Sequence, residues 1–132
     1  MPQIEVSLEQ AGPATSKSVV RGHEVLVDRP AEKGGDDRGM MGGEMLLVSL
    51  GGCFLSNIYA AIRSREAQVS NVRARVAATL DGAPPRFTEI EIVVSAEHDD
   101  REQFEKLLVI AERGCIAANT MRQAAKFTVR AV

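Results

Sequence analysis

The sequence contains few of the residues on which nucleic-acid and metal sites depend. It has no tryptophan, one tyrosine and four phenylalanines, so it offers little aromatic surface for stacking single-stranded bases. Sixteen lysines and arginines against eighteen aspartates and glutamates give a net charge of −2, whereas phosphate binding needs a cationic surface. Two histidines and two cysteines are too few to indicate a zinc site. We therefore expect neither a nucleic-acid partner nor a metal cofactor.

The first ten residues, MPQIEVSLEQ, lack the charged start and the apolar stretch of a signal peptide. We therefore expect a cytoplasmic protein, in a compartment where thiols are normally reduced. A length of 132 residues predicts one domain spanning 1–132, and 45% hydrophobic with 26% charged residues is typical of globular proteins. In such a compartment Cys53 and Cys115 are either packed core residues or reactive groups.

The longest apolar segment, residues 44–65, predicts a helix because it contains no proline and is too long for a typical strand. Its apolar residues lie on nearly every side, which is typical of a buried helix. A membrane span is disfavoured, because no second apolar segment follows and five small or polar residues dilute the first: Ser49, Gly51, Gly52, Ser56 and Asn57. We expect a central helix buried in a protein core.

Alternating apolar and polar residues predict strands around this helix. Residues 4–9 form one strand, and residues 18–21 and 23–28 form a hairpin about Gly22. The glycine-rich segment 29–43 predicts a long loop, of a length that is more often functional than idle.

The second half of the chain predicts a long hairpin of residues 69–80 and 87–97, with one apolar and one polar face. Asp99 or Asp100 caps an amphipathic helix that Gly114 can end. A short helical turn follows, and then a closing strand, 126–132, with Phe127, Val129 and Ala131 on one face. This order predicts an α+β fold, with helices packed on a mostly antiparallel sheet.

The surroundings of the two cysteines are consistent with reactivity as well as with simple packing. Glycine inside a helix costs about 1 kcal/mol relative to alanine, so the pair Gly51–Gly52 predicts that another element approaches closely beside Cys53. Cys115 follows Gly114 and is placed to begin a helix, where the dipole favours the thiolate. Two cysteines are also the number that a redox couple needs. These observations leave open which sulfur attacks, and whether the cysteines only pack.

Two stretches, GHEVLVDRPAEKGGDDRGMMGGEMLLVSLGGCF and AERGCIAANTMR, resemble the signatures of the OsmC/Ohr superfamily, the osmotically inducible and organic hydroperoxide resistance proteins. The shared pattern is a glycine-rich loop, a helix that opens with Glu-Leu-Leu-type residues, a first cysteine after small residues, and a second cysteine about 60 residues later. The resemblance extends over essentially the whole chain, including the order of its elements.

This resemblance implies an OsmC-like fold assembled as an intertwined homodimer, with sites at the subunit interface. It implies a thiol-dependent peroxidase that reduces organic hydroperoxides in oxidative-stress defence. Cys53 would be the attacking cysteine and Cys115 the resolving one, and an external dithiol of lipoyl or thioredoxin type would reduce their disulfide. The implied chemistry needs no metal, haem or flavin cofactor.

The chain departs from the peroxidase pattern at the acidic residue. Members of the hydroperoxide branch carry a catalytic glutamate ten residues before the cysteine, where this chain has Gly43, and Glu44 lies nine before. On a continuous helix, nine residues turn by about 180°, so Glu44 is expected to face away from Cys53. It is either a site residue or a first-turn carboxylate that the helix dipole favours.

The resemblance also implies an arginine that stabilises the thiolate or holds the peroxide. The candidates are Arg21, Arg29 and Arg38, and their spacing does not choose among them.

Three functions are consistent with the sequence. The first is hydroperoxide reduction, and the apolar neighbours Leu50, Phe54 and Leu55 favour an organic substrate. The second is a non-catalytic protein of the same fold that binds a small apolar ligand at the dimer interface. The third is an interaction protein whose cysteines only pack. Neither a nucleic acid nor a membrane is expected as a partner.

Overall fold

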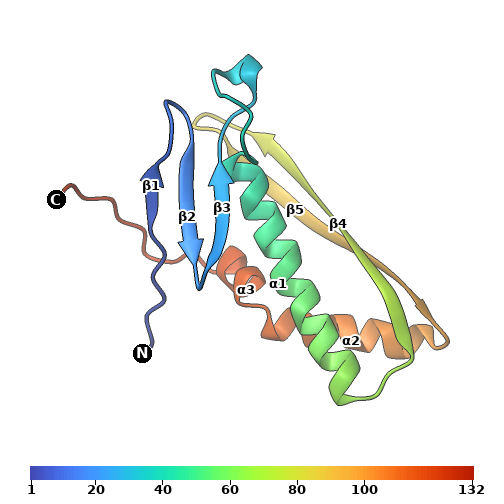
Figure 1. Ribbon diagram of the computed structural model, residues 1–132. Helices are drawn as coiled ribbons and strands as arrows, with labels where there is room; N and C mark the ends of the chain where they lie inside the picture. The colour runs from blue at the N-terminus through green and yellow to red at the C-terminus, as the bar shows by residue number, and fades with distance from the viewer. The chain divides into compact units, whose positions relative to one another are not determined.

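The computed structural model describes residues 1–132 and has an α+β fold of antiparallel sheets and helices (Figure 1). The chain forms two compact units, Met1–Leu46 and Leu47–Val132. The predicted α+β class is therefore confirmed, whereas the single domain over 1–132 stays a prediction.

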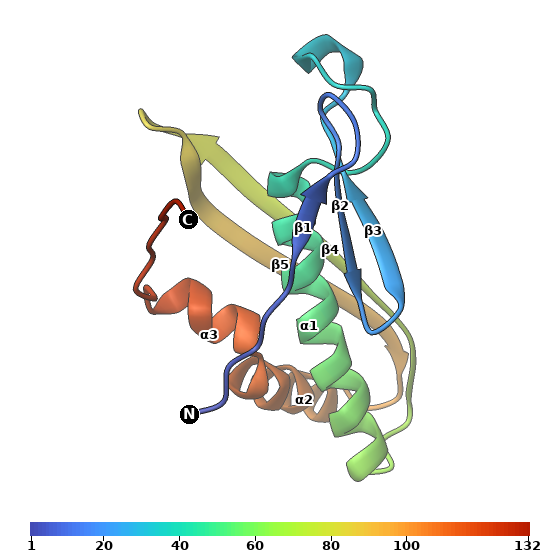
Figure 2. The same cartoon turned by 60° about the vertical axis from the view of Figure 1, so that its left-hand side comes forward.

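The first unit contains a three-stranded antiparallel sheet in the order β1-β2-β3 (Figure 2). Its strands are β1 (Leu8–Gln10), β2 (Ser16–Val20) and β3 (His23–Val27). The predicted hairpin about Gly22 is confirmed. The predicted strand over residues 4–9 is wrong for residues 4–7, because pairing with β2 begins only at Leu8. Ile4 fits the alternating pattern, but it is 90% exposed, so its apolar side chain packs against no other part of the chain.

The predicted loop between β3 and the central helix is confirmed, with one short 3-10 helix, η1 (Ala31–Lys33), inside it. Its course is set by Asp28, whose buried carboxylate accepts a hydrogen bond from the Thr15 hydroxyl at 2.8 Å. The backbone amides of Arg29, Asp36 and Arg38 also donate to it. Burial by itself raises the pKa of Asp28, but these four hydrogen bonds outweigh burial and hold the pKa below its usual value.

Asp28 should make the stability of this unit depend on pH in acid. Because the folded-state pKa is lowered, the stabilisation is fully present above the unfolded-state value of about 3.9 and is lost as the pH falls through the folded-state pKa. Asp28→Asn should therefore lower the melting temperature at neutral pH and flatten its decline between about pH 5 and pH 2. Thermal unfolding against pH checks this, with Asp37→Asn in the same loop as control. A decline as steep as that of the parent would contradict it.

The second unit packs a long hairpin and two short helices against most of helix α1 (Gly42–Ser64). The hairpin strands are β4 (Val69–Asp81) and β5 (Arg86–His98), and the hairpin runs alongside α1 in Figure 1. The alternation predicted for residues 69–80 and 87–97 is confirmed by the burial pattern. The expected close approach occurs at Gly51, where a Cβ would lie 2.9 Å from Val76 Cγ2, but not at Gly52. One residue of the glycine pair thus lets β4 approach α1.

Helix α1 is buried along one stripe rather than all round, which corrects the sequence expectation. Leu50, Gly51, Phe54, Ile58 and Ala61 are buried. On another face Val48 and Tyr59 are 55% and 47% exposed. By length and composition alone the helix could cross a membrane, but its buried stripe belongs to the core of the second unit. The sequence pattern showed that apolar residues lie on most sides of the helix, but it did not show how much of that surface the rest of the chain buries.

Helix α2 (Arg101–Gly114) begins as predicted, with the Asp100 side chain accepting a hydrogen bond from the amide of Gln103. It ends at Gly114, and Cys115 then caps the short helix α3 (Ile116–Arg122). The predicted closing strand over residues 126–132 is wrong for this chain. Phe127 and Val129 are 86% and 85% exposed, and the segment pairs with no strand. Its alternation defines an apolar face, but the segment joins neither of the two sheets.

Candidate functional site

The structure brings Cys53 and Cys115 together in the core of the second unit. Cys53 lies in the middle of α1 and is half-buried, while Cys115 lies at the junction of α2 and α3 with 0% of its surface exposed. The buried residues around them include Leu50, about one turn before Cys53, and Phe54, the residue after it. Both thiols are free, and the Cys115 thiol donates a hydrogen bond to the Cys53 sulfur.

The local environment favours the thiolate form of Cys53. The backbone amide of Ala117 donates to its sulfur and is the largest influence, and it lowers the pKa of Cys53 below its ordinary value. Burial acts in the opposite direction, and the Cys115 thiol and the Ile116 amide add to the lowering. These amides belong to the first turn of α3, where backbone N–H groups have no partner within the helix. The start of α3 thus provides donors for a negative charge on Cys53.

Cys115 has the opposite character. Burial raises the pKa of its thiol, and the neighbouring Cys53 raises it further. The amide of Ala118 donates to its sulfur at 3.4 Å, as expected for the residue that caps α3. The pair therefore consists of a half-buried Cys53 whose pKa is lowered and a buried Cys115 whose pKa is raised. Sequence reasoning left this asymmetry open.

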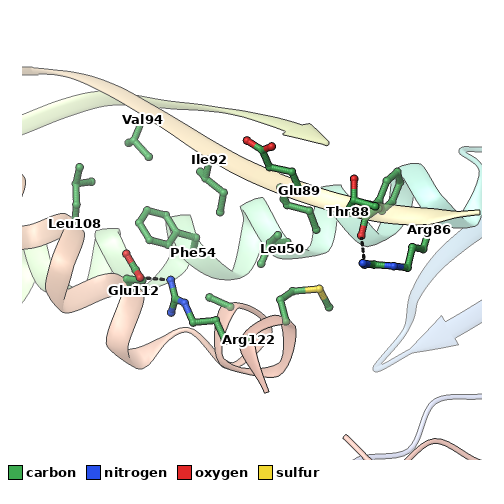
Figure 3. Close-up of a pocket in the computed structure, with 14 residues that line it drawn as sticks. Leu50, Phe54, Arg86, Thr88, Glu89, Ile92, Val94, Leu108, Glu112 and Arg122 are labelled. Carbon is green, nitrogen blue, oxygen red and sulfur yellow. Dashed lines mark hydrogen bonds and ion pairs between the residues drawn. The ribbon is translucent and has the colours of Figure 1, made fainter. Parts of the chain in front are cut away.

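A pocket of about 500 Å³ lies beside the cysteine pair, between the hairpin and the two short helices (Figure 3). Its apolar side comprises Leu50 and Phe54 of α1, Ile92 and Val94 of β5, and Leu108 of α2. An ion pair between Glu112 and Arg122 lies on the opposite side, and Arg86 and Glu89 lie at the end. Neither cysteine lines the pocket, but Leu50 and Phe54 border both it and Cys53. The sequence indicated those two apolar residues but not the charged ones.

Glu44 has a structural partner at the start of α1. Its side chain is exposed and accepts a hydrogen bond from the backbone amide of Met41 at 2.9 Å. A carboxylate that reaches back to the amide three residues earlier is half of a capping box. Its position in the first turn is also favoured by the helix dipole. This contact gives Glu44 a structural role at the start of α1, in agreement with its interpretation as a first-turn carboxylate.

Glu44→Gln should keep most of the hydroperoxide-reducing activity that the family resemblance implies. The glutamine side-chain oxygen can still accept from Met41, and the loss of charge at an exposed helix start costs about 0.3–1 kcal/mol of stability. Steady-state hydroperoxide consumption and the melting temperature of the variant check both points. A loss of activity comparable to that of Cys53→Ser would place Glu44 in the reaction.

The three candidate arginines all belong to the first unit. Arg38 donates through Nη1 to the carbonyl of Ala11 at 2.7 Å and to the Thr15 hydroxyl at 3.4 Å. Arg21 and Arg29 have exposed side chains, in the β2–β3 turn and at the start of the loop. Arg38 therefore has a structural task near Asp28. An arginine that assists Cys53 stays a prediction.

Sequence reasoning missed the groups that contact Cys53 most directly. The backbone amides of Ile116 and Ala117 cannot be recognised from residue types. The only indication that they would be available was the expectation that Cys115 begins a helix. Asn57 was also missed as a contact, although it lies one turn after Cys53 and donates to its carbonyl at 2.9 Å.

Comparison with known proteins agrees with the fold. The family model described as OsmC-like protein matches residues 34–130. Among curated proteins, none matches the chain. An OsmC-like protein from Mycoplasma pneumoniae superposes with a TM-score of 0.81 at 13% identity, covering 93% of this chain and 89% of that one.

Two organic hydroperoxide resistance proteins are also similar in structure. The one from Elizabethkingia anophelis gives a TM-score of 0.68 at 18% identity, covering 93% of this chain and 91% of that one. The one from Legionella pneumophila gives 0.66 at 16%, covering 93% of each chain. At these identities the structural likeness shows the fold alone, whereas the family model spans most of the sequence. The chain belongs to the OsmC-like protein family.

Proposed function

We propose that the protein reduces organic hydroperoxides to alcohols through Cys53 and Cys115. The observation that carries this proposal is the unequal pair: a half-buried Cys53 whose pKa is lowered by the Ala117 amide, in contact with a buried Cys115 whose pKa is raised. The thiolate is the nucleophilic form of cysteine, so the lowered pKa suits Cys53 to the attack. Membership of a family that includes organic hydroperoxide resistance proteins supports the proposal.

The proposed reaction has three steps. The Cys53 thiolate attacks the terminal oxygen of the hydroperoxide, the O–O bond breaks, and the alcohol leaves after taking up a proton, with Cys53 left as a sulfenic acid. The Cys115 thiol then attacks the Cys53 sulfur, which forms the disulfide and releases water. An external dithiol exchanges with the disulfide, is itself oxidised, and restores both thiols.

The surroundings of Cys53 favour an organic substrate over hydrogen peroxide. Leu50 and Phe54 flank it on α1 and form part of the wall of the 500 Å³ pocket. An alkyl or aryl group of the peroxide gains from leaving water at such a surface, by about 25 cal/mol per Å² buried. Hydrogen peroxide has no such group, so it should react more slowly.

Turnover of cumene hydroperoxide tests the proposal. The purified protein is given the peroxide with dihydrolipoamide or with thioredoxin as electron donor, and peroxide loss is followed. We expect sustained turnover with one dithiol and a lower kcat/KM for hydrogen peroxide. Peroxide loss no faster than in the absence of protein, with both donors, would contradict the proposal.

A second candidate function is the binding of a small apolar ligand without turnover. It is favoured by the pocket itself, because neither cysteine lines it while apolar side chains of α1, β5 and α2 do. Under this alternative a fluorescent apolar probe should bind equally well to the parent and to Cys53→Ser, and neither should consume peroxide.

The protein should be a dimer, because α1 leaves apolar side chains uncovered. Val48 and Tyr59 lie on its exposed side, and a second copy packed there would remove them from water. Light scattering at low micromolar concentration should give twice the chain mass of 14.2 kDa. Val48→Glu should weaken the dimer, whereas a charge at an exposed site of a monomer has little effect. A stable, folded monomer for the parent chain would contradict this.

A further inference from the structure

The side chain of Asn57 lies between the two segments that carry the cysteines. Its Nδ2 donates to the carbonyl of Cys53 at 2.9 Å. Its Oδ1 lies 2.9 Å from the position that a Cβ would occupy on Gly114, the residue that directly precedes Cys115. One amide thus contacts the backbone at Cys53 and the backbone beside Cys115.

Gly114 is required for space rather than for its conformational freedom. It is the last residue of α2, and its φ lies outside the left-handed region that favours glycine. A Cβ at 2.9 Å from an oxygen is closer than real side chains tolerate, so either Asn57 or the α2–α3 junction has to move. The atom that the Cβ would meet is the end of the Asn57 side chain, and the same amide group donates to the Cys53 carbonyl, so a shift of this side chain also alters its hydrogen bond to Cys53.

A displacement at Gly114 reaches the reactive groups directly, because the junction is tied together on its other side. The side chain of Asn119 in α3 donates to the carbonyl of Arg113 at 3.1 Å. The amide of Ala118 donates to the Cys115 sulfur, and the adjacent amide of Ala117 donates to Cys53. The start of α3 therefore moves with the end of α2.

We infer that Asn57 is a positioning residue that sets the spacing between Cys53 and Cys115, and that Gly114 provides the space it needs. The inference rests on the proposed function and concerns its second step, the closure of the disulfide. Asn57 touches neither sulfur in this role. It acts through the backbone at both cysteines.

The equilibrium with glutathione measures this spacing without any hydroperoxide. In the form with glutathione bound to Cys53 as a mixed disulfide, the Cys115 thiol attacks the Cys53 sulfur. The Cys53–glutathione bond breaks, the Cys53–Cys115 bond forms, and glutathione leaves as a thiol with the proton from Cys115. Intact mass after acid quenching gives the ratio of the two forms, and hence the effective concentration of Cys115 at Cys53.

Gly114→Ala should lower this effective concentration about tenfold, since a 1 Å misplacement can cost about a hundredfold and a smaller shift is expected here. Asn57→Ala should lower it by a similar factor, because it removes the contact that sets the spacing. The double variant should be no lower than Asn57→Ala alone, because the oxygen that the new methyl group meets is then absent. Gly42→Ala, a glycine with open space around it, is the matched control and should match the parent.

Equal effective concentrations in Gly114→Ala and the parent would overturn the inference. So would a double variant whose effect is the product of the two single effects, because the two residues would then act independently. If Gly114→Ala does not fold, Asn57→Asp decides, since it keeps Oδ1 but cannot donate to the Cys53 carbonyl; a parent-like ratio would again overturn the inference. A parent protein that forms this disulfide normally but consumes no peroxide would remove the proposed function and leave the spacing role intact.

Discussion

Replacing Cys53 with serine should reduce hydroperoxide consumption to the rate without protein. A serine hydroxyl is not ionised near neutral pH, so the amides of Ile116 and Ala117 have no thiolate to stabilise. The fold should persist, because the residue is half-buried and the exchange is nearly equal in size. Peroxide loss under saturating dithiol checks activity, and the melting temperature checks folding. Appreciable turnover by a folded Cys53→Ser protein would assign the attack elsewhere.

The pH dependence of thiol alkylation in the parent protein shows which cysteine is reactive and so serves as the control for Cys53→Ser. Because the pKa of Cys53 is lowered, its alkylation by a bromobimane-type probe should remain fast below about pH 8.5, the ordinary thiol value, and fall only as the pH drops through the lowered pKa. The buried Cys115, whose pKa is raised, should react slowly over this range. Fast alkylation that survives Cys53→Ser would show that Cys115 is the reactive thiol.

Replacing Cys115 with serine should allow one turnover of the proposed reaction and then stop it. Cys53 can still cleave the peroxide, but no thiol is present to attack its sulfenic acid, which advances to the sulfinic acid under excess peroxide. About one equivalent of peroxide per chain should disappear in a rapid phase. Mass spectrometry should then show Cys53 with two added oxygens.

Sustained turnover by Cys115→Ser at the parent rate, with dithiol present, would show that the external reductant attacks Cys53 directly. The serine hydroxyl also replaces the sulfur that accepts from the Ala118 amide. It can accept in the same way, so the cap of α3 should persist.

The elements that could be predicted from the sequence are those whose partners lie nearby in the chain. The strands of the β4–β5 hairpin are joined by a short turn and α2 carries its own cap at Asp100, so local patterns were sufficient. The segment 126–132 has the same alternation as β4, yet it forms no strand. Alternation shows which side chains would share one face of a strand, but it does not show whether the segment pairs with another strand. Likewise, the all-round apolar character of α1 did not reveal that the chain covers only one stripe.

The candidate site could be predicted as far as its two sulfur atoms. Their number and their glycine-rich surroundings pointed to a pair, and the resemblance assigned their order. The cause of the lowered pKa could not be predicted, because it lies in the backbone amides of Ile116 and Ala117, which any residue type would provide. Gly114 ends α2 as predicted, but its closeness to Asn57 could not be predicted, because the two residues lie far apart in the sequence.

The intact mass of the protein after one equivalent of cumene hydroperoxide tests the central claim most directly. A bridge between Cys53 and Cys115 removes two hydrogens, and a dithiol should restore them. The account predicts this reversible loss of about 2 Da in the parent, and no such loss in either single cysteine variant. An unchanged mass with two free thiols would contradict the account and leave the ligand-binding function as the better explanation of the fold.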